Sequence, residues 1–285
     1  MVFRHGNRYK REDKVVIFLS GSTGYLGSTV LAILKSRESP YYTIDRKLEE
    51  LRSKSPHCHM LLHCAGVLRN ASDEEVWSGN VLATRKLLSL LCPDTAIVFA
   101  SSRSASLNST NPDIYARSKF QAEQLVRAHT GSALICRFTA LAGPSPKGTG
   151  RSFLTRIIRE AVRSHIIRVP LLTRPVDVLD VREAAALMAN SASIPFRCWR
   201  TIDGTSGTFD LFGIAGLVAA CVKTAVDREV DIRRVAIAKS QHGRPVDPQG
   251  WQKLLAKCNT RRIPLENTIH DTINAILRHE SSASG

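Results

Sequence analysis

One stretch, residues 15–27, constrains the fold of this 285-residue chain more than any other. It reads VVIFLSGSTGYLG, an apolar run of β-forming residues followed by three glycines at G-x-x-G-x-x-G spacing. The run predicts a parallel strand buried on both faces. Gly21, Gly24 and Gly27 predict a tight turn into a helix over about residues 25–35, because glycine allows the turn, the approach of a pyrophosphate and close helix–strand packing. The segment therefore predicts a dinucleotide site with the anion at a helix N-terminus.

Composition excludes several other classes of protein. The longest apolar run, residues 211–222, is too short to span a bilayer. Residues 1–13 are polar and basic, which predicts a flexible leader and not a secretory signal. The seven cysteines form no C-x-x-C pair, as expected of free thiols in the cytoplasm.

The formal net charge of +15 predicts anionic ligands. A nucleic-acid interface would need clustered basic residues interleaved with aromatic ones. Here Lys and Arg are spread along the chain, and only 6% of residues are aromatic. We therefore expect a field that attracts an anionic cofactor and substrate, with no nucleic-acid partner and no membrane partner.

A predicted second strand, residues 41–44, ends at an acidic residue suited to the adenosine end of a dinucleotide. Asp45 lies 18 residues after Gly27, near the spacing at which a carboxylate bonds the ribose hydroxyls. A surface turn is the alternative interpretation of Asp45. Arg46 follows and could meet a 2′-phosphate. NAD is the predicted cofactor, and NADP stays open.

Short apolar strands alternate with helices through the first half of the chain, which predicts an α/β fold with a doubly wound parallel sheet. A Gly/Pro/Ser-rich stretch, residues 143–152, marks where we expect the chain to leave the sheet. The predicted division is a Rossmann core of residues 14–142, to which 176–202 return, and a small discontinuous C-terminal substrate lobe of residues 143–175 and 203–285.

A second motif, YARSK at residues 115–119, supplies candidate acid/base chemistry. The i, i+4 spacing places Tyr115 and Lys119 on one helix face, where the ammonium is expected to lower the pKa of the phenol. Ser102, at the end of a predicted strand, could hold a substrate oxygen. An exposed helix pair is the alternative for the Tyr and Lys alone.

The order of these motifs resembles the extended short-chain dehydrogenase/reductase superfamily, in particular the NAD-dependent epimerase/dehydratase family. The resemblance runs from about residue 15 to 277. Its segments are GSTGYLG at 21–27, LLHCAG at 61–66, NVLATRKLL at 80–88, VFASS at 98–102, YARSK at 115–119, CRFTALAGP at 136–144 and RPVDVLDVREAA at 174–185.

The resemblance implies an NAD(P)-dependent oxidoreductase or epimerase that acts on a sugar hydroxyl or keto group, within a nucleotide sugar, and it implies a homodimer. The implied catalytic residues are Ser102, Tyr115 and Lys119. The implied cofactor-binding residues are Gly21, Thr23, Gly24, Tyr25, Leu26, Gly27, Asp45, Arg46, Cys64, Ala65, Gly66, Tyr115 and Lys119. The implied substrate-binding residues are Ser102, Arg103 and Arg174.

Departures from the family pattern leave two alternatives open. The segment after Asp45 is short, and Ala140 stands where the family often has a substrate-contacting Asn. Thr201-Ile202-Asp203 replaces a usual Asn-Ile-Gly, and Arg103-Ser104 replaces the Asp-Glu pair of sugar dehydratases. Dehydration is therefore not expected. The alternatives are a reductase of a non-sugar carbonyl and a catalytically silent dinucleotide sensor.

The dense His/Cys patch at residues 57–64 is not predicted to bind a metal. Its members lie on or just before one strand, where neighbouring side chains point to opposite faces and cannot converge on a tetrahedral ion. His63 and Cys64 are better explained as cofactor-lining and core residues.

Overall fold

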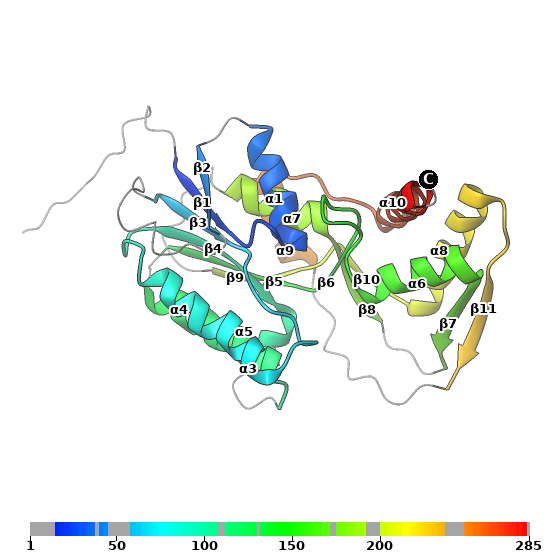
Figure 1. The fold of residues 1–285 in the computed structure, drawn as a ribbon, viewed down its shortest axis with the longest axis horizontal. Coiled ribbons are helices and arrows are strands. Elements are labelled where there is room, and N and C mark those ends of the chain that lie inside the picture. The colour runs from blue at the N-terminus through cyan, green and yellow to red at the C-terminus, as the bar shows by residue number, and fades with distance from the viewer. Residues whose placement is uncertain are drawn as a thin grey trace, which may run out of the picture.

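The structure is a computed structural model that describes residues 15–37, 40–44, 58–107, 112–129, 132–171, 175–191, 200–236 and 248–283. Its central element is a six-stranded sheet with helices on both faces, which confirms the predicted doubly wound α/β fold (Figure 1). All neighbouring strands in it are parallel. In spatial order they are β2 (Tyr41–Ile44), β1 (Ile17–Ser20), β3 (Met60–His63), β4 (Ala96–Ser102), β5 (Ala133–Phe138) and β9 (Arg200–Gly204).

The strand order reverses between β1 and β3, and that reversal positions the site. The chain passes from β1 outward to β2 and then returns to β3 on the other side of β1. In the register of this pair, Ser20 lies opposite His63. The loops that follow both strands therefore meet at one edge of the sheet, where open α/β sheets bind ligands.

Helices cover the two faces of the sheet as separate groups (Figure 1). One face carries α1 (Tyr25–Lys35), α7 (Val181–Asn190) and α9 (Pro248–Lys257). The other carries α3 (Asp73–Trp77), the π-helical turn η2 (Ser78–Leu82), α4 (Ala83–Leu88) and α5 (Ile114–His129). A 3-10 turn, η3 (Arg103–Leu107), follows β4.

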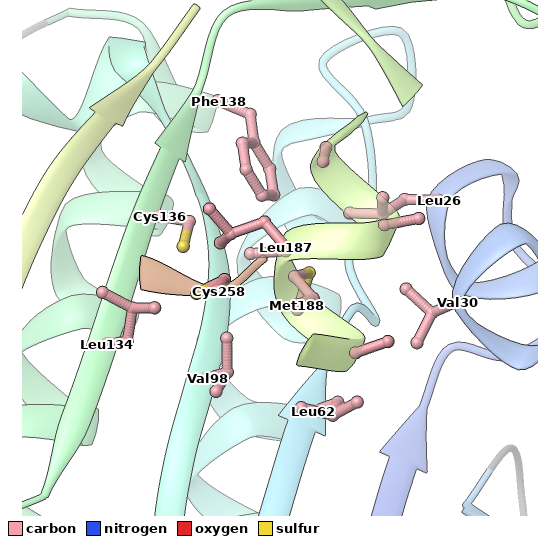
Figure 2. Close-up of a cluster of buried hydrophobic side chains, with 14 of the residues drawn as sticks. Leu26, Val30, Leu62, Val98, Leu134, Cys136, Phe138, Leu187, Met188 and Cys258 are labelled. Atoms are coloured by element: carbon pink, nitrogen blue, oxygen red, sulfur yellow. The ribbon is translucent and has the colours of Figure 1, made fainter. Parts of the chain in front are cut away.

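The core under α1 and α7 fixes the helix that begins at the glycine turn (Figure 2). Leu26 and Val30 of α1 face Leu187 of α7, above Leu62 and other buried strand side chains. Each fully buried side chain of this size contributes roughly 1.5–3 kcal/mol relative to exposure. Because α1 is packed on α7, its N-terminus has a fixed position over the sheet edge.

The C-terminal elements form a second body beside the sheet (Figure 1). A three-stranded sheet joins β10 (Gly207–Phe209), β8 (Val176–Asp180) and β6 (Ala140–Ala142), and a parallel pair joins β11 (Asp231–Val235) to β7 (Ile166–Pro170). The helices of this part are α6 (Phe153–Ser164), α8 (Leu211–Val226) and α10 (Leu265–Ala283). They share an apolar cluster that is separate from the two clusters of the central sheet.

The structure differs from two sequence expectations. Residues 248–257, assigned to the lobe, form α9 and pack on the central sheet, because Trp251, Leu254 and Leu255 bury themselves in its core. The sequence predicts a helix over about residues 80–91, but the helical stretch begins earlier, at α3, where Ser72 and Glu75 form a capping box. The expected leader lies outside the described residues. The rest of the division stays a prediction.

Among the described helices, none combines the length and the apolar character that crossing a bilayer requires.

Candidate functional site

The glycine turn is closed so tightly that side chains are excluded at two of its positions. Gly21 has φ +74°, and a Cβ there would lie 2.6 Å from the backbone nitrogen of Ala65. A Cβ on Gly27 would lie 2.0 Å from the Gly21 carbonyl oxygen. Gly24 is the N-cap of α1, which has no side-chain cap and no acidic residue in its first turn. Its positive end and its first N–H groups thus suit an anion.

Two side chains next to this turn, those of Tyr25 and Leu26, are engaged by other parts of the protein. Leu26 packs in the core beneath (Figure 2). The Tyr25 hydroxyl donates to the Gly143 carbonyl at 2.5 Å, and burial raises the pKa of this phenol. Thr23 is exposed. Any contact of Leu26 with a pyrophosphate would therefore come from the backbone.

The loop after β3 lies against the glycine turn and is held by Asn80, which the sequence did not single out as a site residue. Asn80 Oδ1 accepts from the Val67 N–H at 2.8 Å, and its Nδ2 donates to the Val67 carbonyl at 3.0 Å and to Ser118 Oγ at 3.0 Å. A Cβ on Gly66 would lie 2.9 Å from Asn80 Oδ1. The signal was present in the sequence, since Asn80 leads a segment of the family resemblance.

His63 ties β1, β3 and α4 together below this edge. Its Nδ1 lies 2.6 Å from Ser20 Oγ, and its Nε2 lies 2.9 Å from Thr84 Oγ1, whose hydroxyl donates to the Asn80 carbonyl. Thr84 Oγ1 thus accepts from Nε2–H, and Nδ1 accepts from Ser20. Burial, with help from the charge of Lys119, lowers the pKa of His63 to about 3. The side chain is neutral and structural.

Because His63 is neutral in the folded chain, we expect the free energy of unfolding to depend on pH. The unfolded chain binds a proton at His63 below its ordinary pKa of 6.5, whereas the folded chain stays neutral down to a pKa of about 3. The stability that the folded chain gains by keeping His63 neutral is fully present above pH 6.5. As the pH falls from 6.5 toward 3, the free energy of unfolding decreases by about 1.4 kcal/mol per pH unit. Urea unfolding from pH 7.5 to 5 should show this slope. H63N should flatten it, exposed H270N should not, and equal slopes in both variants would contradict it.

Ser102, Tyr115 and Lys119 come from the end of β4 and the start of α5. The Ser102 and Tyr115 side chains hydrogen-bond each other, and Ser102 Oγ accepts from the Ser104 N–H at 3.2 Å. Lys119 Nζ donates to the Ala100 carbonyl at 2.8 Å and lies 3.5 Å from the position of a Cβ on Gly66. The acid/base motif and the loop beside the glycine turn therefore meet at one edge.

The expected lowering of the Tyr115 pKa is wrong for the chain as it stands. Burial raises the pKa of Tyr115, and only the hydrogen bond to Ser102 and the charge of Arg69 oppose that shift. Burial also lowers the pKa of Lys119 to about 8, against the charge of Glu123. Tyr115 is thus a neutral phenol at neutral pH and can donate a proton.

Arg69 is a second residue that sequence reasoning missed. Its guanidinium lies over the Tyr115 ring, 4.9 Å from the centroid, and pairs with Asp113 at 3.0 Å. The same group donates to Ser104 Oγ at 2.9 Å. Arg69 follows β3 and contacts α5 only through the tertiary fold, so no spacing in the sequence signals it.

The expected substrate residues are placed only in part. Arg103 forms an ion pair with Asp203 of β9, with Nε and Oδ2 3.4 Å apart. Burial raises the pKa of Asp203, while the charge of Arg103 opposes it. Asp45, Arg46 and Arg174 lie outside the described residues. Among the residues that the structure describes, no group of His, Cys, Asp and Glu side chains could hold a metal ion.

The chain belongs to the NAD dependent epimerase/dehydratase family, whose model matches residues 17–193, as the sequence resemblance predicted. No curated protein matches the sequence.

Similar solved structures share the fold. MoeE5 in complex with UDP-glucose and NAD has a TM-score of 0.70 and 17% identity over 93% of this chain and 99% of that chain. RMD from Pseudomonas aeruginosa complexed with NADPH has a TM-score of 0.70 and 17% identity over 93% and 99%. A UDP-N-acetylglucosamine 4-epimerase from Bacillus cereus has a TM-score of 0.66 and 16% identity over 93% and 96%.

Proposed function

We propose that this protein catalyses NAD(P)-dependent hydride transfer at a hydroxyl or keto carbon of a nucleotide sugar, as an epimerase or a ketoreductase. One observation carries the proposal. The hydrogen-bonded Ser102–Tyr115 pair lies at the sheet edge where the glycine turn and the Cys64–Gly66 loop meet. A phenol beside a dinucleotide turn is suited to exchange a proton with a substrate oxygen while hydride moves at the attached carbon.

The residues of the edge fit a dinucleotide. The uncapped N-terminus of α1 suits the pyrophosphate, and the absent side chains at Gly21 and Gly66 let the glycine turn pack on the loop after β3 and that loop pack on Asn80. Asp45 and Arg46 are proposed for the adenosine ribose and Lys119 for the nicotinamide ribose. When bound, the nicotinamide supplies the acceptor or donor of the hydride.

In this mechanism Tyr115 moves the proton and Ser102 orients the substrate. During reduction the neutral Tyr115 donates its hydroxyl proton to the keto oxygen as hydride reaches the carbon. During oxidation the tyrosinate takes the hydroxyl proton back. Ser102 holds the substrate oxygen, and Lys119, with a pKa near 8, stabilises the tyrosinate through its charge. An epimerase would return the hydride to the opposite face of the ketone.

The nucleotide-sugar class is supported by charge and by similar structures. MoeE5 is described in complex with UDP-glucose and with UDP-glucuronic acid. The net charge of +15 favours a diphosphate substrate, and we propose Arg174 and Arg103 as its partners. We also propose a homodimer, in which the half-exposed Trp77 and Leu82 supply apolar surface.

A non-sugar carbonyl is the second candidate substrate, and a specific contact favours it. The guanidinium of Arg103 is engaged by Asp203, one residue of the segment that replaces Asn-Ile-Gly, and Ala140 offers no amide. The Ala140 position lacks the amide that the family often offers to a substrate, and Asp203 competes with a diphosphate for Arg103.

A binding and turnover screen tests the proposal. Nucleotide sugars and simple ketones would be offered to the full chain with NAD or NADP, by calorimetry and by exchange of deuteride from the labelled reduced cofactor. A nucleotide sugar that both binds and exchanges supports the proposed function. Exchange with simple ketones alone supports the second candidate, and dinucleotide binding without any exchange supports a silent sensor.

A further inference from the structure

A cavity lies in the C-terminal part of the molecule, between α6, α10 and the loop at residues 147–151. Its volume of about 440 Å³ lies in the range of small-molecule sites. Within the described chain, its lining includes no residue of β4, α5 or the glycine turn. It is therefore separate from the groups proposed for hydride transfer.

The cavity carries an excess of positive charge. Four of its lining residues are Lys147, Arg151, Arg159 and Arg163, and a single carboxylate, Glu280, faces them. Glu280 is already paired with Arg163, at 2.7 Å between Nε and Oε1. In the part of the chain that the structure describes, no carboxylate forms an ion pair with the other three cations. A concave surface lined by one sign of charge concentrates ligands of the opposite sign.

Neutral groups hold one of these cations in place. The Arg159 guanidinium donates to Thr149 Oγ1 at 2.9 Å and to the Gly150 carbonyl at 3.1 Å. The loop is itself closed by paired backbone hydrogen bonds between Ser145 and Gly148. A Cβ on Gly148 would meet nothing within 4 Å. Hydrogen bonds within the chain thus hold the wall together, and the two groups that accept from Arg159 are neutral.

We propose that this cavity binds a small molecule that carries phosphate groups, at a site additional to the proposed redox site. Guanidinium groups recognise phosphate by paired N–H donors, and lysine adds a point charge. A phosphate group brings more negative charge per volume than a carboxylate, which suits Lys147, Arg151 and Arg159, since none of the three forms an ion pair with a carboxylate of the described residues. Pyrophosphate is the simplest probe of this chemistry.

The test of this proposal is a pyrophosphate titration in which NAD occupies the glycine turn, because that turn is also suited to pyrophosphate. The two sites are adjacent, since a Cβ on Gly150 would lie 2.7 Å from the Tyr25 ring at the start of α1. Titrations of pyrophosphate are therefore run by calorimetry on the full chain at fixed salt, with and without saturating NAD.

The variants separate a built site from a general positive field. K147Q/R151Q removes two cations of the wall, and R156Q/R278Q removes two exposed cations of the same helices outside it. Saturable binding that persists with NAD, falls at least about tenfold in K147Q/R151Q and stays nearly unchanged in R156Q/R278Q is the expected result. Absent binding, binding abolished by NAD, or equal losses in both variants would overturn the proposal.

Discussion

Tyr115→Phe is expected to lower kcat for hydride transfer by about 10²–10⁴-fold, the range that a positioned acid/base contributes. The substitution removes the phenolic proton and keeps the ring, which lies under Arg69. The glycine turn and the Cys64–Gly66 loop are untouched, so the affinity for dinucleotide should not change. The lost hydrogen bond to Ser102 should cost about 1 kcal/mol of stability.

The measurement is deuteride exchange with whichever substrate the screen identifies, together with dinucleotide titration. Tyr42→Phe is the matched control, because Tyr42 is 46% exposed on β2, the strand at the edge of the sheet. It should leave both quantities unchanged. A Y115F variant as active as Y42F would remove Tyr115 from the mechanism, and the Ser102–Tyr115 hydrogen bond would then be structural only.

Local features of the fold were predictable from the sequence because they depend on neighbouring residues. The bounds of α1 follow from the glycine turn, and β5 follows from a short run of apolar β-formers. The start of α3 was readable too, since Ser72 and Glu75 have the spacing of a capping box. The position of α9 was not, because Trp251 reaches the central sheet only after a long excursion of the chain through the lobe.

The candidate site, too, contains features that the local sequence predicts and features that only the tertiary fold creates. Motif spacing placed Ser102, Tyr115 and Lys119 near one another, and the structure brings the first two into contact. The direction of the Tyr115 pKa could not be predicted, because burial depends on every element packed around the ring and outweighs the nearby charges. Arg69 stands 46 residues before Tyr115, and only the folded chain brings its guanidinium over the ring.

Gly27→Ala is expected to damage both stability and dinucleotide binding, because its new methyl group would meet backbone and not a flexible side chain. The Cβ would lie 2.0 Å from the Gly21 carbonyl oxygen and 2.7 Å from its carbonyl carbon. Relief requires α1 to move away from the turn, yet Leu26 and Val30 hold α1 on the core (Figure 2). Overpacking of this kind costs typically 1–3 kcal/mol, and roughly that loss is expected here.

Gly216→Ala supplies the matched comparison, since Gly216 is an exposed helical glycine of α8 whose Cβ would meet nothing within 4 Å. Alanine there should raise the unfolding free energy by about 0.5–1 kcal/mol through helix propensity alone. Urea denaturation gives the unfolding free energy of both variants, and NAD titration gives their affinity for NAD. The two measurements together show whether Gly27 is required by close packing or only by backbone flexibility. If G27A matched G216A in stability and in affinity for NAD, the third glycine would not be needed for helix and turn to meet, and the pyrophosphate site assigned to that turn would lose its structural basis.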